Sequence, residues 1–208
     1  MNIWQGQRIR LRGVEPGDWE TFDRWDQDSE VARLCYHIEF PRSQEGTKKF
    51  ATEAALAEPK GHAYRWMIET LDGVPVGTIN THSCDPRHGT FGYGLAIARE
   101  HWRQGYASEA ICLVLSYYFR ELRYQKVTAH VYAFNEASIR LHERLGFQLE
   151  GRLRRMVFTD GAYHDELIFG MTAEEFAARH VGRQTFEVSE TSKVSISEGS
   201  DAHPPSHS

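Results

Sequence analysis

Residues 91–110, FGYGLAIAREHWRQGYASEA, constrain the fold more than any other part of the sequence. In the first half, large apolar residues alternate with Gly92, Gly94 and Ala96. This alternation predicts a strand with one core face and one face almost free of side chains. The second half places Gly105 in front of a run with apolar residues at helical spacing, which predicts a long helix.

The predicted helix start is suited to an anion. Small residues at positions 105 and 107 would let a ligand approach the unpaired N–H groups of the first turn. Together with the helix dipole, these groups attract a group such as a pyrophosphate. The segment is neither a Walker loop nor a GxGxxG motif. Two alternatives remain open: the segment holds a ligand, or Gly105 only begins the helix and the small strand face only packs against another element.

The rest of the chain alternates irregularly between strand and helix patterns. Strands are predicted over residues 8–12, 63–69, 75–81, 90–98, 126–132, 149–158 and 163–171. Helices are predicted to begin after the N-caps Asp18 and Ser43, at Gly105, at Glu136 and at Thr172. Gly146 is the expected left-handed C-cap of the helix that begins at Glu136. This order predicts an α/β fold with a mixed sheet.

Composition narrows the class of protein. The 208 residues carry a net charge of −5 and are 40% hydrophobic, which predicts one globular domain over residues 8–178 and argues against a nucleic-acid partner. The serine-rich tail over residues 183–208 is predicted to be disordered, because it has few large apolar residues. No apolar run is long enough for a signal peptide or a membrane span. The three cysteines show no metal-ligand spacing, so we expect no metal site and a cytoplasmic location.

A second motif follows the strand that begins near Val127 and reads VTAHVYAFNEASIRLHERLGFQLEGRLRR. The strand leads to Asn135, and Ser138 and His142 lie four residues apart on one face of the following helix. Each has a structural alternative: Asn135 and Ser138 could cap the helix, and His142 could be a solvated position.

The pair WRQGYASEA and NEASIRLHERLGFQLEG resembles the GNAT superfamily of acyl-CoA N-acyltransferases. The subgroup is similar to ribosomal-protein N-terminal acetyltransferases and spermidine acetyltransferases. The resemblance covers residues 8–175, and TDGAYHDELIFGM is similar to the subgroup's closing hairpin. It implies a single domain with a mixed, V-splayed sheet of about seven strands flanked by helices, and acetyl-CoA as cosubstrate.

The resemblance also implies a set of site residues. Backbone groups of Leu95, Ala96 and Ile97 would contact the pantetheine arm. The pyrophosphate would be wrapped by Arg103, Gln104, Gly105, Tyr106, Ala107 and Ser108. The catalytic candidates, which flank the CoA arm, are Asn135, Ser138 and His142.

Two positions depart from the family pattern. Trp102 stands where the loop usually begins with Gln or Arg, and His142 stands where many members have a tyrosine near the CoA sulfur. Either Ser138 or His142 could protonate the departing thiolate. The candidate general bases are Glu39, Asp160 and Asp165, with a water relay as the alternative.

The sequence therefore predicts an N-acetyltransferase that moves an acetyl group to a primary amine by direct attack on the thioester. The acceptor would be a protein N-terminus, a polyamine or a small amine, and a homodimer is compatible with this prediction. The aromatic candidates for walls of the acceptor cleft are Trp25, Tyr36, Trp66 and Tyr163. The alternatives are a catalytically weak CoA-binding regulatory module and a scaffold that binds proteins through its tail.

Overall fold

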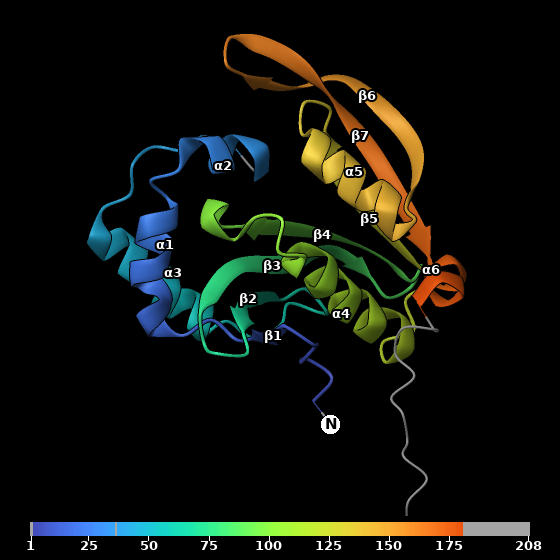
Figure 1. Ribbon diagram of the computed structural model, residues 1–208, viewed down its shortest axis with the longest axis horizontal. Helices are drawn as coiled ribbons and strands as arrows, with labels where there is room; N and C mark the ends of the chain where they lie inside the picture. The colour runs from blue at the N-terminus through green and yellow to red at the C-terminus, as the bar shows by residue number, and fades with distance from the viewer. Residues whose placement is uncertain (1, 36, 181–208) are drawn as a thin grey trace, which may run out of the picture.

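A seven-stranded sheet with the order β1-β2-β3-β4-β5-β7-β6 organises the molecule (Figure 1). The computed structural model describes residues 2–35 and 37–180, so the predictions for Tyr36 and the tail lie outside the described residues. The strands are β1 (Ile9–Arg12), β2 (Arg65–Thr70), β3 (Pro75–Asp85), β4 (Thr90–Ile97), β5 (Lys126–Tyr132), β6 (Gln148–Thr159) and β7 (Ala162–Thr172). The helices are α1 (Trp19–Trp25), α2 (Ser29–Cys35), α3 (Gln44–Ala55), α4 (Tyr106–Arg120), α5 (Glu136–Leu145) and α6 (Ala173–His180), with 3₁₀ turns at Pro16–Asp18 and Arg99–His101.

The sheet is mixed, as predicted, because β4 and β5 run parallel while the other neighbouring pairs are antiparallel. Their pairing joins Thr90, Phe91 and Gly92 to Lys126, Val127 and Thr128, respectively. Beyond that point β4 continues to Ile97 and β5 to Tyr132 without further pairing to each other. The two strands therefore diverge into the arms of a V (Figure 1). This confirms the predicted V-splayed sheet.

Two apolar clusters hold helices on opposite faces of the sheet. On one face, α4 packs its buried Ile111, Leu115 and Tyr118 against residues such as Phe91 of β4. On the other face, Met67 of β2 joins a smaller cluster with α1 and α3. This division follows from the alternation of β2, in which Trp66 and Ile68 join the larger cluster and Met67 the smaller one.

Predicted helix ends are partly confirmed. Ser43 Oγ accepts a hydrogen bond from Gly46 N at 3.1 Å and caps α3, and Gly146 ends α5 with φ +98°. The prediction for Asp18 is wrong in one respect: it stands at the N-cap of α1, but its side chain makes no capping bond. Its carboxylate instead accepts two bonds from the Arg12 guanidinium, both at 2.8 Å. The carboxylate also accepts from Glu15 N at 2.7 Å, so Arg12 and Glu15 use its oxygens in place of the amides of α1.

No helix among the described residues is long and apolar enough to cross a membrane.

Candidate active site

The turn before α4 has the geometry of an anion-binding helix start. Gly105 occupies the N-cap with φ +82°, a conformation that glycine adopts without a Cβ penalty. It offers no side chain to cap the helix, so the N–H groups of the first turn, at Tyr106, Ala107 and Ser108, are left for another partner. The structure thus brings residues 103–108 together in the predicted loop.

A positive charge lies beside this turn, and the sequence analysis did not identify it. Arg8 donates from Nη1 to the Gln104 carbonyl oxygen at 2.8 Å and from Nε to Glu109 Oε2 at 3.0 Å. A Cβ built on Gly105 would lie 2.8 Å from Arg8 Nη1, so the guanidinium approaches the glycine closely. Arg8 comes from the segment before β1, and no local pattern links it to the loop.

Trp102, which departs from the pattern of the resembled family, attaches the loop to β4 through its indole. Its indole Nε1 donates to the Ile97 carbonyl oxygen at 2.7 Å, and the Arg99 guanidinium lies 5.4 Å from the ring centroid. The indole thereby fastens the loop to the end of β4. The Trp102 indole therefore holds the loop in place without a Gln or Arg side chain at this position.

The small face of β4 is less open than predicted. A Cβ on Gly92 would come within 2.6 Å of the His82 ring, and a Cβ on Gly94 within 3.1 Å of Asn80 Oδ1. Side chains of β3 therefore fill the space over both glycines, as the packing alternative required. Leu95, Ala96 and Ile97 lie past the last β4–β5 pair, so this stretch of β4 has one edge facing the V.

Asn135 holds two elements at the mouth of the V. Its Oδ1 accepts from Ser138 N at 3.0 Å, which caps α5, and its Nδ2 donates to the Leu34 carbonyl oxygen at 3.1 Å. The capping alternative is therefore confirmed for Asn135. The second bond adds a function that the sequence did not reveal, because it ties the end of α2 to the start of α5.

His142 is buried, not solvated, with 5% of its surface exposed. Its Nδ1 lies 2.8 Å from the Ser138 carbonyl oxygen and 3.4 Å from Ser138 Oγ. Because a carbonyl oxygen only accepts, Nδ1 carries the proton and Nε2 is the acceptor of the neutral ring. Tyr93 Oη lies 2.7 Å from Nε2 and is therefore the donor.

The surroundings keep this pair neutral. Burial lowers the pKa of His142 and raises the pKa of Tyr93 well above its usual value. Phe147 and Phe169 pack against the His142 ring with centroids 5.0 and 5.6 Å away. Both ring nitrogens are engaged, so the geometry favours Ser138 over His142 as the group free to act on a ligand.

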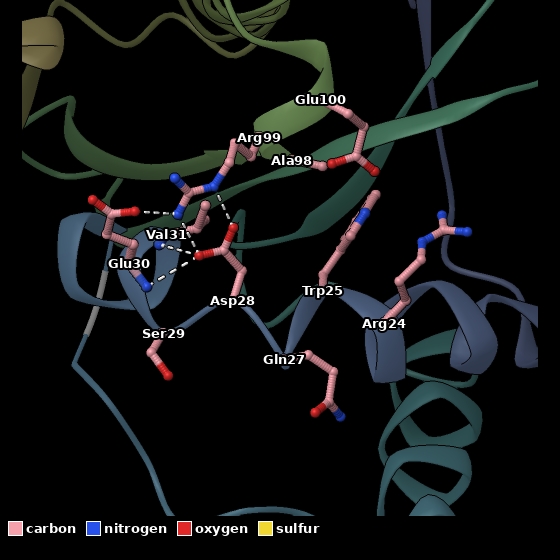
Figure 2. Close-up of a pocket in the computed structure, with 10 residues that line it drawn as sticks. All are labelled: Arg24, Trp25, Gln27, Asp28, Ser29, Glu30, Val31, Ala98, Arg99 and Glu100. Carbon is pink, nitrogen blue, oxygen red and sulfur yellow. Dashed lines mark hydrogen bonds and ion pairs between the residues drawn. The ribbon is translucent and has the colours of Figure 1, made fainter.

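A cavity of about 460 Å³ opens between α1, α2 and the end of β4 (Figure 2). Arg99 crosses it: Nε and Nη2 lie 2.7 Å from the two oxygens of Asp28, and Nη2 lies 2.6 Å from Glu30. The Arg99 bonds hold the pKa of Asp28 at about 2. Trp25, one of the predicted cleft aromatics, lines this cavity, and its buried Nε1 has no hydrogen-bond partner among the residues that the structure describes.

The other predicted cleft aromatics with a described position, Trp66 and Tyr163, do not line this cavity. Trp66 packs against Trp4 and Tyr64, with centroids 5.3 and 4.9 Å away. Tyr163 is 57% exposed on the β6–β7 hairpin, under the Arg155 guanidinium.

None of the predicted bases is free. Asp165 accepts from Arg152 Nε at 2.6 Å and from Arg155 N at 2.9 Å, and these bonds lower its pKa. Asp160 lies 3.7 Å from Arg33, and Glu39 lies 3.6 Å from Arg42. All three carboxylates therefore lie within 4 Å of an arginine side chain, and for Asp165 this contact disfavours proton uptake.

Comparison with known proteins places these features in context. A family profile described as an acetyltransferase (GNAT) domain matches residues 8–148. An uncharacterized SPbeta prophage-derived N-acetyltransferase of Bacillus subtilis is 42% identical over 86% of this chain and 98% of its own length. The spermidine N(1)-acetyltransferase of Escherichia coli is 24% identical over 83% of this chain and 90% of its own length.

Solved structures share the fold. A putative acetyltransferase from T. thermophilus superposes with a TM-score of 0.72 at 28% identity, over 87% of this chain and 96% of that one. The spermidine N-acetyltransferase from Vibrio cholerae in complex with CoA and spermine gives a TM-score of 0.70 at 22% identity, over 81% and 97%. These relatives are named as acetyltransferases, so the regulatory alternative gains no support.

Proposed function

Since the chain belongs to the GNAT family of acetyltransferases, we propose that it transfers the acetyl group of acetyl-CoA to a primary amine by direct attack of the amine on the thioester. One observation carries the proposal: an uncapped, glycine-opened helix start lies at the end of a strand whose edge faces the V. Such a helix start suits a pyrophosphate, and an unpaired strand edge suits the amides of a pantetheine arm.

The residues present fit the cosubstrate. The N–H groups that follow Gly105 would bind the pyrophosphate, with Arg8 adding a positive charge beside the turn. Backbone groups of residues 95–97 would bind the pantetheine arm. Bound acetyl-CoA supplies the activated acetyl group, and the chain orients it and handles the protons.

The chemistry makes two demands on the protein. An aliphatic amine with a pKa near 10.4 is neutral in only about one molecule in a thousand at pH 7, a deficit of about 4 kcal/mol. A proton acceptor must therefore lie where the amine enters. A donor must also meet the thiolate as it leaves, and we assign this role to Ser138 on α5, with Asn135 fixing the helix start.

The acceptor class is a primary amine: a protein N-terminus, a polyamine or a small amine. Two relatives are named as spermidine acetyltransferases, which supports an amine with an alkyl chain. The cavity beside α2 adjoins the end of β4, because Ala98, on its wall, follows Ile97 directly.

A thiol-release assay with acetyl-CoA and a panel of amines tests this function. We expect release that depends on both substrates, together with a product heavier by one acetyl group. CoA at 100 times its dissociation constant should stabilise the chain by about 2.7 kcal/mol in thermal unfolding. Stabilisation without amine-dependent release would contradict the transfer reaction, and absence of stabilisation would contradict the cradle.

A further inference from the structure

Two histidines lie on the face of the sheet opposite α4, at the vertex of the V. His82 on β3 pairs with Gly92 on β4, and Gly92 pairs in turn with Thr128 on β5. His130 follows Thr128 by two residues on β5 and therefore points to the same face. The neighbours of these residues in sequence, such as Thr81 and Ala129, are buried against the helices.

The His82 ring lies directly on the backbone of β4. Its Cε1, Nδ1 and Nε2 would be 2.6, 3.1 and 3.2 Å from a Cβ built on Gly92, a contact that only glycine permits. Gly92 is also the last β4 residue that pairs with β5. The imidazole therefore covers the point at which the two strands separate, while the residue as a whole remains exposed to solvent.

The proposed function runs the pantetheine arm along β4 toward this point, and the inference rests on it. The loop over residues 103–108 follows β4, so an arm that starts there and passes Ile97 and then Leu95 runs back toward the start of the strand. Each residue of a strand advances by about 3.3 Å, so the far end of the arm would lie beside Tyr93 and Gly94.

The groups around His82 keep it neutral near pH 7. Burial of the ring lowers its pKa first, His130 on β5 lowers it further, and the Tyr93 backbone opposes both. Ser83 Oγ lies 3.2 Å from Nδ1. His130 itself lies 3.3 Å from Glu166 on β7. Among the described residues, no group of three His, Cys, Asp or Glu side chains is placed to hold a metal ion.

We propose that His82 is the general base that takes the proton from the acceptor amine as the amine attacks the thioester carbonyl. One ring nitrogen accepts the N–H proton, the amine lone pair forms the C–N bond, and the C–S bond breaks with its electrons on sulfur. The thiolate then takes the proton of the Ser138 hydroxyl, and water returns a proton to the serine oxygen. His82, exposed to solvent, returns its proton to water.

This assignment separates the two proton transfers in space. His82 and His130 lie on the face opposite α4. The helix α5, which carries Ser138, lies on the same face as α4 (Figure 1). An amine that approaches from the histidine side meets the base first, and the sulfur leaves on the other side. Neither group competes for the same proton.

His82→Gln tests the proposal, with His88→Gln as the matched control. His88 lies in the exposed turn after β3 and is bonded to Asp85. With an alkylamine at pH 7, we expect His82→Gln to lower kcat/KM for the amine by about 100-fold and to leave the KM for acetyl-CoA unchanged. With a fluorinated alkylamine, whose nitrogen gives up its proton more readily once it has attacked, the loss should be smaller, below about tenfold. The control should match the wild type with both amines.

No loss with the alkylamine, or an equal loss in the His88→Gln control, would overturn the assignment. Gly92→Ala gives a second measure, because the added methyl must displace the His82 ring and should reproduce the same amine-dependent loss. His130→Gln should raise the pH of the acidic limb of kcat/KM, and an unmoved limb would contradict the proposal. A wild type that turns over no amine would instead overturn the proposed function and this inference with it.

Discussion

Removal of the buried hydrogen bond between Tyr93 and His142 should destabilise the fold by a defined amount. Tyr93→Phe takes away the hydroxyl 2.7 Å from Nε2 and leaves that nitrogen without a donor, in a site where the two residues are 7% and 5% exposed. An unsatisfied buried acceptor costs about 1–3 kcal/mol. For a domain of this size, each kcal/mol lowers Tm by about 2–4 °C, so 2 kcal/mol corresponds to about 4–8 °C.

A double-mutant cycle isolates the bond from the change in packing. His142→Phe leaves the Tyr93 hydroxyl unpaired, whereas the double variant has neither polar group and keeps two rings of similar size. Replacing both partners of a buried bond by apolar groups can be nearly neutral, so the double variant should be at least 1 kcal/mol more stable than the sum of the single changes predicts. Denaturant unfolding of the four proteins at pH 7.5 measures the difference. Additivity within about 0.5 kcal/mol would refute the bond.

Three further outcomes follow from the site. Gly105→Glu should abolish CoA binding in calorimetry, because it places a carboxylate at the pyrophosphate turn and strains a φ of +82°; unchanged affinity would contradict the cradle. His142→Ala should lower kcat less than tenfold if Ser138 is the acid, and a loss beyond a hundredfold in turnover assays would reverse that ranking. The unfolding free energy should fall as pH drops below about 6.5, because unfolded histidine binds a proton there while burial keeps the pKa of the folded His142 lower. In a pH series of denaturant titrations, His142→Phe should show a shallower dependence of the unfolding free energy on pH.

Local patterns predicted the elements well because their determinants lie within a few residues. The strands predicted over residues 63–69 and 75–81 are β2 and β3, and the turn between them contains Gly73 with φ +87°. Ser43 caps α3 and Gly146 ends α5 because each acts on amides or carbonyls three or four positions away. Such interactions need no knowledge of which strands are neighbours.

Contacts between residues far apart in the sequence could not be predicted from local patterns. Asp18 has the composition of an N-cap, but the carboxylate is taken by Arg12 from β1. The alternation around Gly92 correctly predicted a strand face without side chains of its own. It could not predict that the β3–β4 register lays His82 over that face. His142 looked like a helix-surface residue until the fold brought Tyr93 to its Nε2.

The contrast between local interactions and contacts across strands explains why sequence motifs identify the cosubstrate cradle more readily than the groups that move protons. The cradle uses backbone N–H groups, so it requires only small residues in a continuous loop, and such a loop leaves a local pattern. A proton acceptor needs one side chain at the vertex of the V, which β3 and β5 flank together with β4. In this chain His82 of β3 lies over Gly92 of β4, ten positions away in the sequence. The register of the sheet, and not a local motif, is therefore what places this histidine at the vertex.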